Sequence, residues 1–223
     1  MKGQISASMM CADLLNMERD IRLMEKHHVE LLHCDVMDRH FVPNLMMFPD
    51  MINRIAEVTQ TPLDVHLMVE DPASILPSLK LREGDYVSLH AESTVHLQRA
   101  LAAIRARGWK PALALNPATP LCMIEELLPD FDMLLLMTVN PGYSGQKLIP
   151  QCLDKITRAR KLLDDAGYAA TPIEVDGNCS LENTPKMMAA GAEIIVAGSS
   201  SVFDKRLGVE KGVKALRRSM GQA

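Results

Sequence analysis

Short apolar segments alternate with longer amphipathic segments eight times along this 223-residue chain, and this alternation restricts the fold more than any other feature. Each apolar segment has the length and composition of a strand that is buried on both faces of a sheet. The predicted strands are Gln4–Ser8, Glu30–Met37, Leu63–Val69, Tyr86–His90, Ala112–Asn116, Met133–Val139, Ile173–Asp176 and Ile194–Gly198. The predicted helices are Asp13–Lys26, Pro49–Val58, Pro72–Leu81, Thr94–Ala106, Ile124–Leu128, Gln151–Ala166, Leu181–Ala189 and Lys205–Arg218.

Eight evenly spaced strand–helix units predict a closed (β/α)₈ TIM barrel that occupies residues 1–223 as a single domain. The alternative is an open, doubly wound sheet, but no G-x-G-x-x-G motif follows the first predicted strand. A barrel also predicts that functional residues lie at the C-terminal ends of several different strands.

Composition and charge exclude several classes of protein. The net charge is −4 with acidic and basic residues interspersed, which opposes nucleic-acid binding. Apolar runs such as Met133–Met137 are too short to span a membrane, and the first residues lack the apolar core of a signal peptide. Five cysteines without a C-x-x-C motif oppose a disulfide framework or a cysteine zinc site. We therefore expect a cytoplasmic enzyme.

Three predicted strands carry ionisable residues that share one face of the strand near its end. These residues are His33 and Asp35, then Asp64 and His66, then Glu174 and Asp176. Taken singly, each is more typical of a hydrogen-bonded core residue or a turn. Ionisable side chains inside a barrel are unfavourable unless they are paired or bind a metal ion. Imidazole and carboxylate ligands suit Zn²⁺, Mn²⁺, Fe²⁺ or Co²⁺, so a divalent metal site is predicted at His33, Asp35, His66 and Asp176.

Glycine-containing loops follow the last three predicted strands, at Asn140–Gln146, Asp176–Ser180 and Gly198–Ser201. Any one of them is equally well explained as a tight turn. Glycines let backbone N–H groups approach an anion, and the loops after strands 7 and 8 are the usual phosphate site of a TIM barrel. Three such loops together favour a phosphorylated ligand.

Long motifs resemble the ribulose-phosphate 3-epimerase family over nearly the whole chain. The motifs are Ile5–Asp13, His33–Asn44, Asp64–Val69, Met137–Gln146 and Glu174–Gly177. The resemblance implies a TIM barrel that binds one divalent metal ion and forms homo-oligomers, either dimers or hexamers. The first expectation for the ion is Zn²⁺, with Mn²⁺, Co²⁺, Fe²⁺ or Mg²⁺ as alternatives.

The resemblance also implies the roles of particular residues. It assigns metal ligation to His33, Asp35, His66 and Asp176. It assigns substrate contacts to Ser8, His66, Gly142, Tyr143, Ser144, Gly145, Gly177, Gly198 and Ser199, with Met37, Met68 and Met137 lining the sugar pocket.

Two departures from the family pattern bear on the function. Arg39 stands where the family usually has glycine, and because glycine tolerates positive φ, a β-carbon there predicts a different path for this loop. Asn178-Cys179-Ser180 replaces a sequence of the Gly-Val-Asn type that pentulose enzymes carry. Together with Met10-Cys11, this loop resembles the D-allulose-6-phosphate 3-epimerase branch. We therefore expect conversion of D-allulose 6-phosphate to D-fructose 6-phosphate, with D-ribulose 5-phosphate to D-xylulose 5-phosphate as the alternative.

The chemistry of C3 epimerisation explains why these residue types are needed. Loss of the C3 proton leaves an enediolate, whose charge a metal ion stabilises as a Lewis acid. Inversion needs one acid–base group on each face, which predicts Asp35 and Asp176 as the catalytic pair. A Schiff-base aldolase would need a lysine at a strand end, and none is found there. The acid pair also opposes a metal-dependent decarboxylase of similar fold and a non-catalytic sugar-phosphate binding protein.

Overall fold

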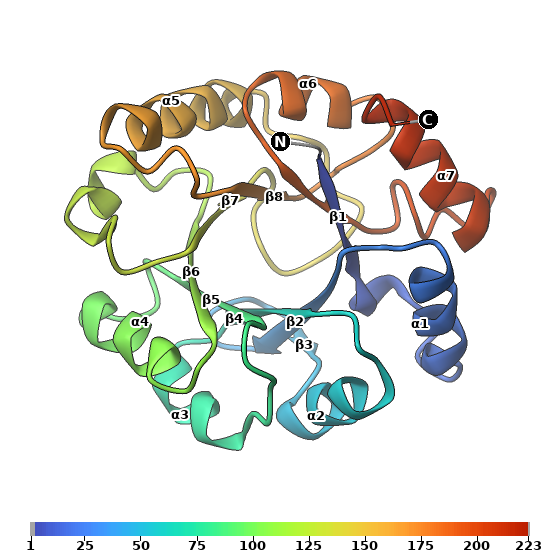
Figure 1. The fold of residues 1–223 in the computed structure, drawn as a ribbon, viewed down its shortest axis with the longest axis horizontal. Coiled ribbons are helices and arrows are strands. Elements are labelled where there is room, and N and C mark those ends of the chain that lie inside the picture. Colours follow the sequence, from blue (N-terminus) through green and yellow to red (C-terminus); the bar gives the residue numbers. More distant parts are fainter. Residues whose placement is uncertain (1–2, 223) are drawn as a thin grey trace.

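Eight parallel strands close into a barrel in the computed structural model, which describes residues 3–222 (Figure 1). The strands are β1 (Gln4–Ser8), β2 (Leu31–Asp38), β4 (Leu63–Met68), β5 (Tyr86–His90), β6 (Lys110–Leu115), β7 (Met133–Met137), β8 (Ile173–Asp176) and β9 (Ile194–Ala197). Closure is made by β1, which pairs in parallel with both β2 and β9. The prediction of a TIM barrel is therefore confirmed, and the open-sheet alternative is wrong.

Helices form a ring outside the barrel (Figure 1). They are α1 (Met17–Lys26), α2 (Pro49–Val58), α3 (Pro72–Ile75), α4 (Leu97–Arg105), α5 (Gln151–Asp165), α6 (Thr184–Ala189) and α7 (Val209–Ser219). Three 3₁₀ segments add Met9–Cys11, Leu76–Ser78 and Leu121–Leu127. Within residues 3–222, none of these helices is long and apolar enough to cross a membrane.

Several predicted helices are shorter than the sequence pattern indicates. The first begins at Met17 instead of Asp13, because the Asp13 carboxylate accepts the N–H of Leu15 and forms a turn ahead of the helix. The third ends its α-helical part at Ile75, since Pro77 has no backbone N–H to continue it. The fifth predicted helix is a 3₁₀ segment, Leu121–Leu127.

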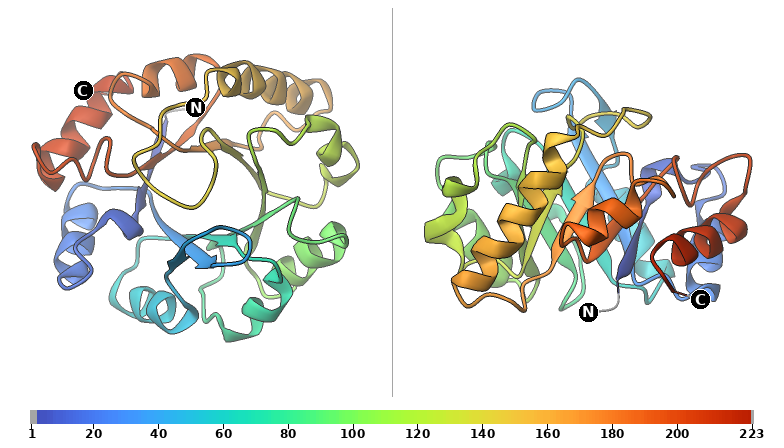
Figure 2. Two further views of the ribbon diagram at one scale, coloured as in Figure 1. Left: turned by 180° about the vertical axis from the view of Figure 1, so that it is seen from behind. Right: turned by 90° about the horizontal axis from the view of Figure 1, so that it is seen from above.

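One strand is not anticipated by the sequence pattern. β3 (Leu45–Met46) pairs antiparallel with Met37 and Asp38, so it extends β2 beyond the barrel. Two residues are too few to show a periodicity. The hairpin formed by β2 and β3 and the loop after β7 both protrude from one side of the barrel, opposite the termini (Figure 2, right).

The barrel interior is divided into an apolar floor and a polar upper layer. Leu31, Ala112, Met133 and Ile194 form the floor, and each is at most 5 % exposed. Above it lie fully buried polar side chains, including His33, Asp64 and His66. The outer faces of the strands pack against the helices in one large hydrophobic cluster. Because the floor seals the lower end, the polar layer opens only toward the C-terminal ends of the strands.

Candidate metal centre and active site

Four of the predicted ligands converge at the mouth of the barrel. His33 and Asp35 come from β2, His66 from β4 and Asp176 from the end of β8. Each offers one ligand atom, and the four atoms lie within 4.8 Å of one another. The convergence follows from strand register, because Asp35 is paired with His66 on the neighbouring strand.

The distances show one common centre. Asp35 Oδ1 lies 3.2 Å from His33 Nε2 and 3.4 Å from His66 Nδ1. Asp176 Oδ2 lies 3.8 Å from His33 Nε2 and 3.7 Å from His66 Nδ1. Two imidazole nitrogens and two carboxylate oxygens therefore face one small space.

This cluster fits a divalent metal ion. Among the contacts of residues 3–222, the buried Nδ1 atom of His66 has no hydrogen-bond partner. A buried nitrogen aimed at two carboxylates is unfavourable unless a proton or a metal cation lies between them. The donor set suits Zn²⁺, Mn²⁺, Fe²⁺ or Co²⁺.

Burial and charge set the protonation of the cluster. Burial opposes ionisation of Asp35, but the neighbouring His33 and His66 outweigh it and hold the pKa of Asp35 well below its usual range. Burial and the nearby charge of Asp35 raise the pKa of Asp176 to about 6. The carboxylates of Asp64 and Asp35 outweigh the burial of His33, so the pKa of His33 is well above its usual value.

A second buried acidic pair lies on the other side of His33. Asp64 Oδ2 is 2.5 Å from His33 Nδ1 and accepts a hydrogen bond from Ser6 Oγ at 2.8 Å. Asp64 therefore fixes the ring with Nε2 toward the metal centre. Glu174 lies 4.0 Å from the same nitrogen, and burial together with Asp64 raises the pKa of Glu174 well above its usual value. The sequence pattern places both acids on this face but gives no role for them.

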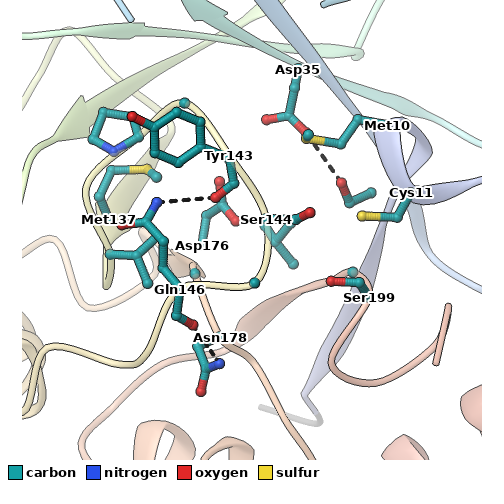
Figure 3. A pocket seen from close by; sticks show the side chains of 18 of the residues that line it. Met10, Cys11, Asp35, Met137, Tyr143, Ser144, Gln146, Asp176, Asn178 and Ser199 are labelled. Carbon is teal, nitrogen blue, oxygen red and sulfur yellow. Dashed lines mark hydrogen bonds between the residues drawn. The ribbon is translucent and has the colours of Figure 1, made fainter. Parts of the chain in front are cut away.

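Above the cluster is one open pocket that contains most of the predicted substrate residues (Figure 3). Its lining includes Ser8, Asp35, Met37, Met68, Met137, Gly142, Tyr143, Ser144, Gly145, Asp176, Gly177, Gly198 and Ser199. His33 and His66 are fully buried, behind these lining residues. Residues to which the sequence assigned no individual substrate contact also line it, namely Met10, Cys11, Val139, Asn140, Pro141, Gln146, Asn178, Cys179, Val196 and Ser200. Several of these lie in the predicted glycine loops, and this position in the sequence could have identified them as pocket residues.

Two protruding loops are tied together beside the pocket. Asn44 Nδ2, from the segment after β2, donates a hydrogen bond of 2.8 Å to the carbonyl oxygen of Gly142. Arg39, in the same segment, has a φ of 66°. Arg39 thus adopts a left-handed conformation that glycine tolerates more readily, and the different path of this loop stays a prediction.

Comparison with known proteins identifies the family. Residues 4–203 match the profile of the Ribulose-phosphate 3 epimerase family. The ribulose-phosphate 3-epimerase of Bacillus subtilis (strain 168) is 41% identical over 197 residues, covering 88% of this chain and 91% of that protein. The ribulose-phosphate 3-epimerase of Methanocaldococcus jannaschii is 39% identical over 220 residues, covering 99% of this chain and 92% of that protein.

Solved structures with low sequence identity share the fold. KGPDC from Streptococcus mutans has a TM-score of 0.70 at 8% identity, covering 99% of this chain and 98% of that one. The 3-hexulose-6-phosphate synthase from Salmonella typhimurium has a TM-score of 0.67 at 15% identity, covering 97% of this chain and 98% of that one. Sequence and fold thus agree, and the chain belongs to the ribulose-phosphate 3-epimerase family, as an isomerase that epimerises a ketose phosphate at carbon 3.

Proposed function

We propose that the chain interconverts D-ribulose 5-phosphate and D-xylulose 5-phosphate with one divalent metal ion in the cluster. The observation that carries the proposal is the convergence of Asp35 and Asp176 with two histidines beneath the pocket. The choice of sugar rests on the relatives, whose names specify ribulose phosphate. The expectation of D-allulose 6-phosphate as the preferred substrate has less support than the alternative.

The cluster residues would hold the ion, through the ring nitrogens of His33 and His66 and the carboxylates of Asp35 and Asp176. A divalent cation held there would supply positive charge that stabilises the negative charge left when C3 loses its proton. Strands β2 and β8 are separated by β1 and β9 around the barrel. The two aspartates therefore approach a substrate from different sides.

Proton transfer is assigned to these two carboxyl groups. One aspartate removes the C3 proton, and the other, protonated, returns a proton from the opposite face. Their opposite pKa shifts make Asp176 the carboxyl group that binds a proton more readily and Asp35 the one that stays ionised. The roles exchange when the reaction runs in the other direction. Ser8 Oγ donates a hydrogen bond of 3.1 Å to Asp35 Oδ2, which orients that carboxylate.

The remaining pocket residues would bind and enclose the sugar phosphate. Met37, Met68 and Met137 are at most 3 % exposed and offer an apolar wall that excludes water without donating a proton. The loops at Gly142–Gly145, Gly177 and Gly198–Ser199 line the outer part of the pocket. Their backbone N–H groups are the proposed phosphate ligands.

The loop after β8 is the basis for testing a longer sugar. Asn178 Nδ2 donates a hydrogen bond of 2.7 Å to the carbonyl of Gln146, which joins the loops after β7 and β8. Cys179 is 1 % exposed, and its thiol donates to the carbonyl of Val175 at 3.5 Å. The distinctive thiol therefore packs against the backbone of β8, which weakens the argument that it enlarges the pocket for a hexulose.

The experiment is a comparison of kcat/KM for D-ribulose 5-phosphate and D-allulose 6-phosphate with one fixed metal. We expect the pentulose to be preferred by roughly 10- to 200-fold, the selectivity that one additional carbon group can generate. A preference for the hexulose would contradict the proposed substrate while leaving the epimerase chemistry in place. Activity on neither sugar would contradict the proposed function.

A further inference from the structure

A chain of buried polar groups lies behind His66, on the side away from the metal centre. His66 Nδ1 faces Asp35, while the other ring nitrogen, Nε2, lies 2.9 Å from Nε2 of His90. His90 Nδ1 is in turn 3.2 Å from Glu92 Oε2. His90 is fully buried at the end of β5, and the ring of Phe41 lies 4.8 Å from it, centroid to centroid. The chain thus runs from the metal centre through two imidazole rings to a carboxylate.

The far end of the chain is held in place by the loop after β6. Glu92 Oε1 accepts the backbone N–H of Asn116 at 2.9 Å and the hydroxyl of Thr119. The carbonyl of Asn116 accepts a hydrogen bond of 2.6 Å from Lys155 Nζ, on a side chain of α5 that is almost fully buried. Burial opposes ionisation of Glu92, but the hydrogen bonds from His90, Thr119 and Asn116 outweigh it and lower its pKa to about 2. Glu92 is therefore a carboxylate that only accepts hydrogen bonds.

The direction of each hydrogen bond follows from that carboxylate. Because Glu92 only accepts, His90 Nδ1 must carry the proton between them. Full burial favours the neutral ring of His90, whose Nε2 then has a free lone pair and accepts. His66 Nε2 must therefore donate, which leaves Nδ1, the ring nitrogen that faces Asp35 and Asp176, to bind the metal ion.

We propose that His90 and Glu92 are positioning residues that hold His66 in the one tautomer able to bind the metal ion through Nδ1. The inference rests on the metal site proposed above. Asp64 does the same for His33 from the other side of the centre, so each histidine has a carboxylate at the end of its own hydrogen-bond chain. Such partners typically change metal affinity by about 10- to 100-fold when they are removed.

Glu92→Gln is the most informative substitution because it reverses the direction of the hydrogen bonds between Glu92, His90 and His66 without changing the size of the side chain. Asn116 and Thr119 would keep the amide oxygen on their side, so the amide NH₂ would face His90 Nδ1. His90 would then accept at Nδ1 and donate from Nε2 toward His66. Two N–H groups cannot face each other, so the His66 proton would move to Nδ1 and oppose metal binding.

Two substitutions at His90 separate hydrogen bonding from packing. His90→Gln supplies a carbonyl oxygen toward His66 and an NH₂ group toward Glu92, and so reproduces both hydrogen bonds. His90→Leu removes both. The matched control for Glu92→Gln is Glu193→Gln, because the side chain of Glu193 is 18 % exposed, against 25 % for Glu92, and it precedes β9 at the opposite end of the barrel.

The test is a Co²⁺ titration of the full chain after chelation, with a competing chelator to obtain the affinity. We expect Glu92→Gln and His90→Leu to weaken Co²⁺ binding by about 10- to 100-fold, and His90→Gln and Glu193→Gln to stay within about threefold of the unsubstituted chain. In ¹⁵N spectra of the Zn²⁺-bound chain, His90 should carry its proton on Nδ1 and accept at Nε2.

Unchanged Co²⁺ affinity in Glu92→Gln would overturn the positioning role and leave the metal site intact. Failure of the unsubstituted chain to bind Co²⁺ would overturn the proposed metal site itself. If Glu92→Gln does not fold, the ¹⁵N spectrum of the unsubstituted chain decides. A proton on Nδ1 of His90 supports the proposal, and a proton on Nε2 of His90 refutes it.

Discussion

Asp35 and Asp176 contribute ligand atoms to one cluster that spans at most 4.8 Å, yet their pKa values shift in opposite directions. Two carboxyl groups this close cannot both ionise freely, because their negative charges repel each other. The histidines stabilise the charge of Asp35, and that charge together with burial favours the proton on Asp176. The metal-free chain thus places a carboxylate that stays ionised, Asp35, beside one that takes up a proton near pH 6, Asp176.

Asp35→Asn and Asp176→Asn should each lower kcat by at least about 10²-fold, because each removes proton transfer on one face of the sugar. The substitutions are nearly isosteric, so circular dichroism should show an intact fold. Both residues are also proposed ligands, and metal content must therefore be measured beside turnover. Near-normal epimerisation by either variant would refute the two-base mechanism.

Metal binding should release protons, and the number should depend on pH. At pH 7 His33, whose pKa is well above its usual value, still carries a proton on Nε2, whereas Asp176, with a pKa of about 6, is mostly ionised. Binding at pH 7 should therefore release about one proton, rising toward about two at pH 5, so affinity falls as pH falls. Calorimetry in buffers of different ionisation enthalpy measures this number. A binding enthalpy independent of the buffer would contradict the assigned ligands.

Arg39→Gly should stabilise the fold. Left-handed backbone costs a residue with a β-carbon roughly 1–2 kcal/mol, partly offset because glycine gains more entropy on unfolding. The expected net effect is an increase of about 1 kcal/mol in the free energy of unfolding, measured by urea denaturation. Arg39→Ala is the control, since it keeps the β-carbon and should give no gain. A destabilised glycine variant would show that the Arg39 side chain contributes more than its backbone costs.

Gly177→Ala should damage both stability and catalysis. A β-carbon at this position, with φ of 125°, would lie 2.5 Å from Val139 Cγ2 and 2.8 Å from the Val139 nitrogen. The clash should destabilise the chain by about 1–3 kcal/mol and displace the loops after β7 and β8, lowering kcat/KM. Gly84→Ala is the control, because its φ is 87° but the described residues leave the space around its β-carbon open to 4 Å. Equal losses of stability and of kcat/KM in both variants would show that the effect comes from backbone strain alone.

Strand-level features were predictable from the sequence, because period-2 alternation shows which side chains share a face. This is why His33, Asp35, His66 and Asp176 could be grouped before their contacts were known. Helix starts were predicted less well, since local side-chain bonds such as the one from Leu15 to Asp13 compete with the helix.

Contacts between distant segments could not be read from the pattern. The hydrogen bond between Asn44 and Gly142 and the chain from His66 through His90 to Glu92 depend on how separate loops meet after closure. His90 ends a predicted strand, which was a signal, but nothing local connects it to His66. Subunit assembly and cellular compartment stay predictions.

The central claim, metal-dependent two-base epimerisation, is tested most directly by NMR of D-ribulose 5-phosphate turnover in ²H₂O, using chelated enzyme with and without added Co²⁺ or Zn²⁺. We predict that xylulose 5-phosphate forms with deuterium at C3, and that omission of the metal slows this by at least about 10²-fold. Full activity in the metal-free chain, or a product that keeps the original C3 proton, would contradict the account.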